Sequence, residues 1–131
     1  MRRHFGGASV AHMATVGRDG RPHIVPICFA LEGDSLHFVV DAKPKRTIYL
    51  KRLQNIAANP AVSIMADHYE DDWANLWWVR VDGAARLLTD GGEAGRALDL
   101  LINRYRQYQE NRPGGPVVAV SIDRWSGWSG A

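Results

Sequence analysis

The sequence predicts a mainly β domain of the α+β class, built as a small closed barrel of six antiparallel strands with two inserted helices. Short apolar runs of strand-like composition recur between tight-turn signals such as Asp19-Gly20 and Gly33-Asp34. Two other segments repeat their apolar residues at helical spacing. Closure into a barrel is favoured because it removes exposed strand edges, and a plain β-sandwich is the alternative. The strands are expected at residues 13–16, 23–31, 35–40, 61–67, 77–88 and 117–122, and the helices at 48–58 and 89–110.

Length and composition predict a single domain over residues 1–131, because the chain shows no linker and no repeat. No run approaches the roughly 18 consecutive apolar residues that a membrane-spanning helix needs. The basic N-terminus is not followed by an apolar segment of secretory length. Cys28 is the only cysteine, which excludes an internal disulfide and a cysteine-based metal site. We therefore expect a soluble, cytoplasmic protein.

The second predicted strand, residues 23–31, contains a proline. The segment is apolar on both faces, which predicts cover on both sides. Pro26 cannot donate a hydrogen bond to a neighbouring strand. This point is therefore an edge, a bulge or a place where something other than a strand lies alongside, and a bound ring system is one such neighbour.

The fifth predicted strand, residues 77–88, alternates with a period of two. The alternation places Trp77 and Val79 on one face and Trp78 on the other. Gly83 marks a bulge or a bend in this strand. The acidic segment 68–72 that precedes it is predicted to be a surface loop.

The helix predicted at residues 48–58 begins directly after a cluster of cations. Lys43, Lys45 and Arg46 precede it, and Thr47 is a candidate cap. Cations are disfavoured at a helix N-terminus, because the macrodipole is positive there and the first backbone N–H groups lack partners. An anion bound to those N–H groups would remove the conflict, and phosphate is a common occupant. The alternative is a solvated basic turn.

The residue patterns of several other kinds of chemistry are absent. The histidines show no metal-ligand spacing, and no nucleophile elbow, P-loop or Rossmann glycine motif occurs. His68 lies beside aspartates and could hold a hard cation, although an acidic surface loop explains the same residues. His23 and His37 lie within strands, where a hydrogen-bonded structural role is expected. A net charge of +2 predicts no general attraction to nucleic acid, so we expect neither nucleic-acid nor membrane partners and name no catalytic residue.

Several segments carry a recognisable pattern. They are Met13-Ala14-Thr15-Val16, Asp19-Gly20-Arg21-Pro22-His23-Ile24-Val25-Pro26-Ile27, Lys43-Pro44-Lys45-Arg46-Thr47 and Asn59-Pro60-Ala61-Val62-Ser63. Together they resemble the pyridoxamine 5′-phosphate oxidase-like, FMN-binding split β-barrel superfamily, over nearly the whole chain. Three further segments, residues 67–73, 76–83 and 124–129, look like its deazaflavin (coenzyme F420)-dependent branch.

The resemblance implies a six-stranded split β-barrel with two or three short helices, paired in a homodimer with two cofactor sites in the grooves between subunits. The cofactor phosphate would rest on the turn and helix start after the third strand, which is the anion site inferred above. The implied phosphate site consists of Lys45, Arg46 and Thr47, with Lys43 and Lys51 as supporting charges. The implied edge of the ring site is the backbone of Val25, Pro26, Ile27, Val40 and Asp41.

Two tryptophans are further candidates for the cofactor site. Trp78 would pack near the ring or across the dimer, and Trp125 of the partner subunit is the second aromatic candidate. Both residues have an alternative role as interface or core side chains, because large aromatics dominate interfaces in general.

The activity that the resemblance implies is hydride transfer between reduced F420 and an unidentified small organic substrate, while the protein binds, orients and shields the cofactor. Tyr69 or His68 would be a proton donor only if the loop 68–72 folds over the site. Two alternatives stay open: an FMN-binding flavin reductase or oxidase of the same fold, and a non-catalytic protein that binds a flavin, a deazaflavin or haem. Residues 5–12 predict at most a short helix, which would leave the substrate side more open.

Overall fold

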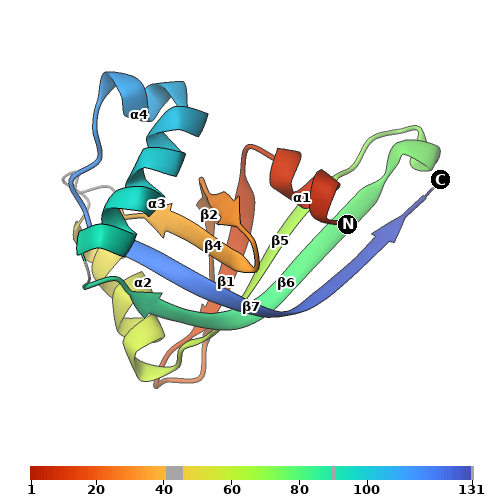
Figure 1. Ribbon diagram of the computed structural model, residues 1–131. Coiled ribbons are helices and arrows are strands. Elements are labelled where there is room, and N and C mark those ends of the chain that lie inside the picture. The colour runs from red at the N-terminus through yellow and green to blue at the C-terminus, as the bar shows by residue number, and fades with distance from the viewer. Residues whose placement is uncertain (41–45, 90, 131) are drawn as a thin grey trace.

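The structure, a computed structural model, describes residues 1–40, 46–89 and 91–130, with the side chains of these residues except 46–50. Within these ranges seven strands form one antiparallel sheet in the order β2-β1-β5-β6-β7-β4-β3. The sheet curls into a half-barrel (Figure 1). The strands are β1 Ala11–Val16, β2 Pro22–Ile27, β3 Ala30–Glu32, β4 Ser35–Val39, β5 Ala61–His68, β6 Trp77–Leu87 and β7 Val117–Ser129.

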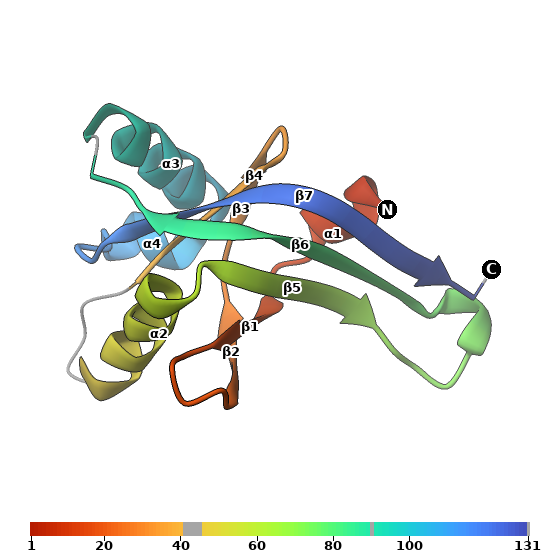
Figure 2. The same ribbon diagram turned by 90° about the horizontal axis from the view of Figure 1, so that it is seen from below.

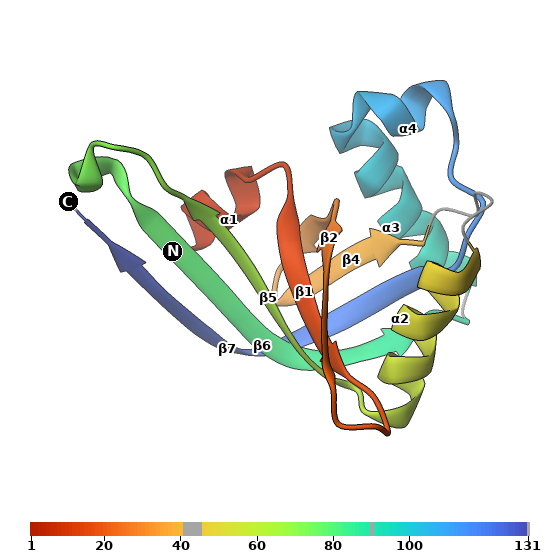
Figure 3. The ribbon, with the colours of Figure 1, turned by 180° about the vertical axis from the view of Figure 1, so that it is seen from behind.

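The helices lie around the half-barrel, and a hairpin arm projects from it. Helix α1 contacts β5 and β6, α2 packs beside β1 and β6, and α3 crosses β3, β4 and β7 (Figure 2). The end of β5, the start of β6 and the end of β7 extend beyond the half-barrel as an arm, with a short 3-10 turn, η1, at its tip (Figure 3). The bounds are α1 Arg2–Gly7, α2 Arg46–Ala58, η1 Trp73–Asn75, α3 Gly91–Arg104 and α4 Arg106–Glu110.

The predicted mainly β, split-barrel class is confirmed, but the element count was wrong. In the described residues there are seven strands rather than six, because the strand predicted at 23–31 breaks at Cys28 and Phe29 into β2 and β3. There are four α-helices rather than two or three, because the second predicted helix breaks at Tyr105. The final strand also continues to Ser129 instead of ending at Ile122. The first helix lies at Arg2–Gly7 rather than within 5–12.

Both breaks have one physical cause, a clamp between the end of α3 and the β2–β3 junction. The Phe29 N–H donates a hydrogen bond to the Tyr105 hydroxyl at 3.0 Å, and the Arg104 guanidinium donates to the Phe29 carbonyl. The same two side chains reach the start of β1, where Tyr105 donates to the Ser9 carbonyl at 2.8 Å and Arg104 donates to the Ala8 carbonyl. Side chains therefore satisfy the Phe29 backbone groups that a continuous strand would have paired with a neighbour.

The main core fills the inside of the half-barrel, and a smaller core lies under α3. Strand β4 separates them, with Leu36 and Phe38 facing the main core and Val39 facing Leu101 of α3. Helix α1 adds the fully buried Phe5 to the main core. The N-terminal segment therefore covers part of the inner face. The expected opening of the substrate side stays a prediction. The large, fully buried side chains are Phe5, Met13, Phe29, Leu36, Phe38, Ile64, Leu101, Val40, Val79, Val81, Val118 and Val120.

His37 lies on the α3 side of β4 and is only 3% exposed. We expected a hydrogen-bonded structural histidine, but neither of its ring nitrogens has a partner among the described residues. Burial lowers the pKa of His37 below its ordinary value of 6.5, and Arg86 and Arg96 act in the same direction against Glu32 and Glu93. The imidazole is therefore held neutral beneath the helix.

Replacing Tyr105 by phenylalanine should destabilise the protein by about 1–3 kcal/mol, because the Phe29 N–H and the Ser9 carbonyl both lose the hydroxyl that satisfies them. Chemical denaturation monitored by circular dichroism measures this loss. Tyr69→Phe is the matched control, since Tyr69 is exposed on the arm. An equal, small effect of both substitutions would contradict the role of the clamp.

His37 should make the protein lose stability on acidification. Its pKa is lower in the folded than in the unfolded state, so its contribution is complete above about pH 6.5 and is lost as the pH falls through the folded value. The His37→Leu variant should therefore show a flatter dependence of unfolding free energy on pH between 7 and 5. His12→Leu, at an exposed histidine, should keep the wild-type dependence.

Candidate functional site

The outer face of the sheet carries the side chains that the core does not use. On β6 the alternation is as predicted: Val79 and Val81 are buried, while Trp78, Arg80 and Asp82 point outward. The strand register aligns these outward residues with outward residues of the neighbouring strands. The aligned sets are Asp67-Trp78-Trp128, Met65-Arg80-Ser126 and Ser63-Asp82-Arg124.

A hollow of about 360 Å³ opens on this outer face, near the arm. Trp78 and Met65 supply apolar walls, and Arg80 and Asp67 supply charges of opposite sign. Tyr69 of the arm also lines it. The hollow therefore combines an aromatic surface with a few polar groups, which is the usual make-up of a small-molecule site.

Asp82 ties the three strands of this face together. Its carboxylate accepts a hydrogen bond from the Ser63 hydroxyl at 2.6 Å, and it forms ion pairs with Arg124 at 3.1 Å and Arg80 at 3.3 Å. The hydrogen bond from Ser63, followed by that from Arg124, lowers the pKa of Asp82. The carboxylate is therefore charged at neutral pH, and it fixes Arg80 at the rim of the hollow.

A bulge decides which residues of β7 reach this face. The register shifts between Asp82 and Gly83: Arg124 lies opposite Asp82, whereas Ile122 lies opposite Gly83, so Asp123 is the extra residue. An extra residue reverses the side to which all later side chains point. Gly83 permits the close approach, because a Cβ there would lie 2.1 Å from the Ser121 carbonyl oxygen. The sequence predicted a bulge or a bend at Gly83, and the register shift occurs at this residue, with the extra residue in β7.

The start of α2 lies where the sequence predicted the anion site. Helix α2, Arg46–Ala58, begins before the predicted start at residue 48. Thr47 therefore lies within the first turn of the helix, and the prediction that it caps the helix was wrong. Lys43, Lys45 and Asp41 lie outside the described residues, as do the side chains of Arg46 and Thr47. Of the predicted phosphate site, the described residues therefore include the helix start and Lys51.

Lys51 lies further along α2 and points toward the β1–β2 turn. Its ammonium group is 3.5 Å from the Asp19 carboxylate. Both residues line a hollow of about 500 Å³ between the turn and α2, together with Arg18 and Gln54. Asn55 fixes the helix against β1 through a buried hydrogen bond from its amide to the Thr15 hydroxyl at 3.1 Å.

The residues predicted to edge the ring lie at strand ends. Strand β2 is an edge strand of the described sheet, which explains how it contains Pro26, and Pro26 is exposed while Val25 and Ile27 are buried. Val40 is also buried, and its N–H donates to the Pro116 carbonyl at 2.9 Å. Of these residues, Pro26 therefore has an exposed side chain, whereas the side chains of Val25, Ile27 and Val40 are withdrawn from a ligand.

Trp125, the second aromatic candidate, packs inside its own chain. Its ring contacts Phe5 edge-on, with centroids 5.7 Å apart, and the Arg2 guanidinium lies 4.8 Å from its centroid. In this chain the residue therefore holds α1 on the inner face. Sequence reasoning missed Met65, Asp67 and Arg80, whose outward alternation on β5 and β6 was the available signal.

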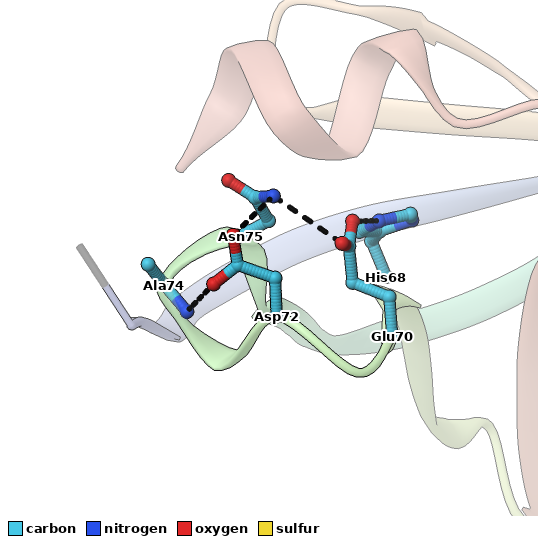
Figure 4. A network of polar contacts seen from close by, with 5 residues as sticks. All are labelled: His68, Glu70, Asp72, Ala74 and Asn75. Carbon is cyan, nitrogen blue, oxygen red and sulfur yellow. Dashed lines mark hydrogen bonds and ion pairs between the residues drawn. The ribbon is translucent and has the colours of Figure 1, made fainter.

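The tip of the arm is a hydrogen-bonded turn (Figure 4). His68 Nε2 lies 2.6 Å from a Glu70 oxygen, and the Asn75 amide donates to the other oxygen of Glu70 at 3.3 Å. Asp72 accepts from the Ala74 N–H at 3.1 Å and so begins the 3-10 turn. The hydrogen bond from His68, followed by that from Asn75, lowers the pKa of Glu70. Together with the Asp72–Ala74 bond they give the acidic loop a defined shape.

Two general features of the described residues bear on the kind of site. No group of three or more His, Cys, Asp or Glu side chains comes together there as a metal site would require. Of the helices in the same residues, none has the length and apolar character to cross a membrane.

The fold and the sequence agree on the family. The sequence matches the family described as pyridoxamine 5′-phosphate oxidase over residues 1–129. The chain belongs to this family. A search of curated protein sequences found no match.

This member of the pyridoxamine 5′-phosphate oxidase family is similar to several solved structures. One is a FAD-binding protein from Mesorhizobium loti (TM-score 0.70, 22% identity, covering 93% of this chain and 86% of that one). Another is a FAD-binding protein from Mycobacterium smegmatis (TM-score 0.65, 23% identity, 96% and 89%). A third is a haem storage protein from Vibrio cholerae (TM-score 0.72, 15% identity, 94% and 87%). At these identities the likeness shows the fold alone.

Substituting Gly83 by alanine should destabilise the protein by about 3 kcal/mol, since the added Cβ meets backbone atoms of β7 that cannot move without breaking the bulge. Gly95→Ala is the matched control: its Cβ meets nothing within 4 Å, and alanine should stabilise helix α3 by about 0.5–1 kcal/mol. Thermal unfolding of both variants tests the pair. An unchanged melting temperature for Gly83→Ala would contradict the role given to the bulge.

Proposed function

We propose that the protein is an F420-dependent oxidoreductase that works as a homodimer. One observation carries the proposal: the three segments that resemble the deazaflavin branch, 67–73, 76–83 and 124–129, lie side by side in the sheet. The first two are neighbours along the chain and pair at the start of one hairpin, whereas 124–129 comes much later in the sequence and pairs with 76–83. Trp78 lies between Asp67 and Trp128, and Asp82 pairs with Arg124. Residues of the first two segments therefore line one hollow, and the third segment lies beside them on the neighbouring strand.

The outer face suits a planar ring with polar substituents. The hollow offers the Trp78 and Met65 surfaces for stacking and packing, and the Arg80 guanidinium for a ring carbonyl or another acceptor. When bound, the reduced deazaflavin supplies a hydride to an electrophilic substrate. The residues of this chain bind and orient the cofactor and exclude water.

The phosphate of the cofactor is proposed to bind at the start of α2. The helix begins at Arg46, directly after Lys43-Pro44-Lys45 in the sequence, so its free N–H groups and these cations favour an anion. Lys45, Arg46 and Thr47 are the proposed ligands, with Lys43 and Lys51 in support. The peptide edge from Val25 to Ile27, and Val40 with Asp41, would bound the ring.

The strand register favours a site shared between two copies. Pro26 and Arg80 are separated by three strand spacings, β2 to β1 to β5 to β6, which is about 14 Å. A ring that rests on the β2 edge therefore cannot also rest on Trp78 of the same chain. Ile24 on β2 is 66% exposed and Met65 on β5 is 38% exposed, so the outer face also has apolar surface for a partner to cover.

Two alternatives have support of their own. Two similar structures are named FAD-binding proteins, and the same helix start would suit the phosphate of a flavin, so FMN or FAD is the alternative cofactor. Another similar structure is named a haem storage protein, so a non-catalytic carrier of haem or flavin is the second alternative. Haem would need a histidine ligand, and His68 on the arm is the one whose replacement tests this.

The proposal predicts that the protein prefers F420 to FMN, FAD and haem. Titration of each cofactor into the purified protein, followed by tryptophan fluorescence, measures the four affinities. The Lys45→Ala, Arg46→Ala double variant should lose at least tenfold in F420 affinity, because two charge-assisted phosphate contacts are removed.

The matched control for this titration is the Arg106→Ala, Arg112→Ala double variant, which removes the same charge from exposed positions in and after α4. It should bind F420 like the wild type. A preference for FMN or FAD would move the protein to the flavin alternative. Binding of haem alone, abolished by His68→Ala, would instead make it a carrier.

A further inference from the structure

The arm tip exposes large aromatic side chains that its own chain does not cover. We define the arm tip as residues 67–75. Trp73 is 75% exposed and Tyr69 is 62% exposed. The hydrogen bonds of Glu70 and Asp72 fix the shape of the turn on which these two side chains are presented. A rigid turn with exposed aromatics is typical of a surface that another protein covers.

The arm tip is also acidic. Residues 67–72 contain four carboxylates and one histidine. Asp67 and Asp71 are exposed, and the histidine, His68, is paired with Glu70. The partner surface should therefore be basic and should offer a hollow for an aromatic side chain.

The other end of the half-barrel is basic and contains a hollow. The hollow of about 500 Å³ between the β1–β2 turn and α2 is bordered by Arg18 and Lys51, and Arg21 is exposed on the same turn. Among the described residues that line the hollow, Asp19 is the one carboxylate, and it pairs with Lys51. Figure 3 shows that the arm tip and this basic end lie at opposite ends of the half-barrel, so the two cannot meet within one chain.

We propose that the arm tip of one protomer docks in the basic hollow of a second copy, with Trp73 in the hollow and Asp71 facing Arg18. The inference rests on the proposed homodimer and extends it. In a two-fold pair the contact occurs twice and closes the assembly. Lys51 lies five residues after the start of α2, about 8 Å along the helix axis, so the docked tip would form a wall of the partner's phosphate site.

Charge reversal tests the contact. The Asp71→Arg and Arg18→Asp variants should each raise the dissociation constant of the homodimer at least tenfold, because each places like charges opposite one another. The doubly reversed chain should recover most of the wild-type affinity. Sedimentation velocity over a range of concentrations measures self-association, and F420 titration is run on the same samples. Asp99→Arg, on the exposed face of α3, is the matched control and should leave the dimer unchanged.

A cross-link tests the geometry independently of charge. In a Cys28→Ser background, a Trp73→Cys chain is mixed with a Gln54→Cys chain and oxidised. The proposal predicts a disulfide between the two kinds of chain. Tyr108→Cys, on α4, replaces Gln54→Cys in the control mixture and should give no such bond.

The outcomes separate this inference from the proposed function. A dimer that binds F420 but ignores the reversals and gives no cross-link overturns the docking alone. A monomer, or a chain of copies that lengthens with concentration, overturns it as well. A dimer that responds as predicted but does not bind F420 supports the docking and overturns the proposed cofactor.

Discussion

The outer face of this protein depends on a single constraint, the close approach of Gly83 on β6 to Ser121 on β7. Only glycine fits there, and the approach forces one extra residue, Asp123, into β7. Before the bulge the even-numbered residues of β7 point inward, as Val118 and Val120 do; after it the even-numbered residues point outward. Arg124 consequently meets Asp82, and Trp128 lies beside Trp78. Without the bulge the charged and aromatic residues of this strand would enter the core, where an unpaired charge is strongly unfavourable.

A second constraint shapes the opposite part of the sheet. The clamp of Arg104 and Tyr105 on Phe29 ends β2 and starts β3, so the chain passes from one edge of the sheet to the other within two residues. This makes β2 and β3 the two edges of an incompletely closed barrel. The clamp also explains the interruption between α3 and α4, because Tyr105 leaves the helical conformation to place its hydroxyl on the Phe29 N–H. The contacts of Arg104 and Tyr105 with Phe29 therefore separate β2 from β3, and they also position α3 over the smaller core.

The sequence was sufficient for those features that local periodicity determines. The period-two pattern around Trp78 predicted the two faces of β6, and the apolar spacing after Arg46 predicted α2, because each depends on neighbouring residues only. The predicted strand boundaries were wrong at Phe29 and beyond Ile122, because residues distant in sequence determine the structure there. The strand break needs Tyr105, 76 residues away, and the extension of β7 needs the pairing with β6. For the site, the prediction that Trp78 packs near the cofactor ring or across the dimer stays a prediction. In the structure Trp78 lines the hollow together with Arg80 and Met65, which the sequence did not single out because they come together only when β5 and β6 are aligned. Trp125 was considered for the partner's site but packs against α1, since the bulge turns it inward.

The side chains on the inner face of the sheet are buried, whereas many of those on the outer face are exposed. Stability and ligand binding therefore depend on different residues. Strand β4 is covered on both sides, by the main core and by α3, so nearly every side chain on it contributes to stability. In contrast, the arm of β5, β6 and β7 is covered on its inner face alone, and its outward side chains contact one another across the strands. Exposed apolar groups such as those of Ile24 and Trp128 gain little free energy from the fold of a single chain, because they remain in water. Residues at these positions can therefore change with little effect on unfolding, whereas any ligand or second copy that covers the face must interact with them. The inner face therefore determines the stability of the protein, and the outer face is the one that we propose for ligand binding.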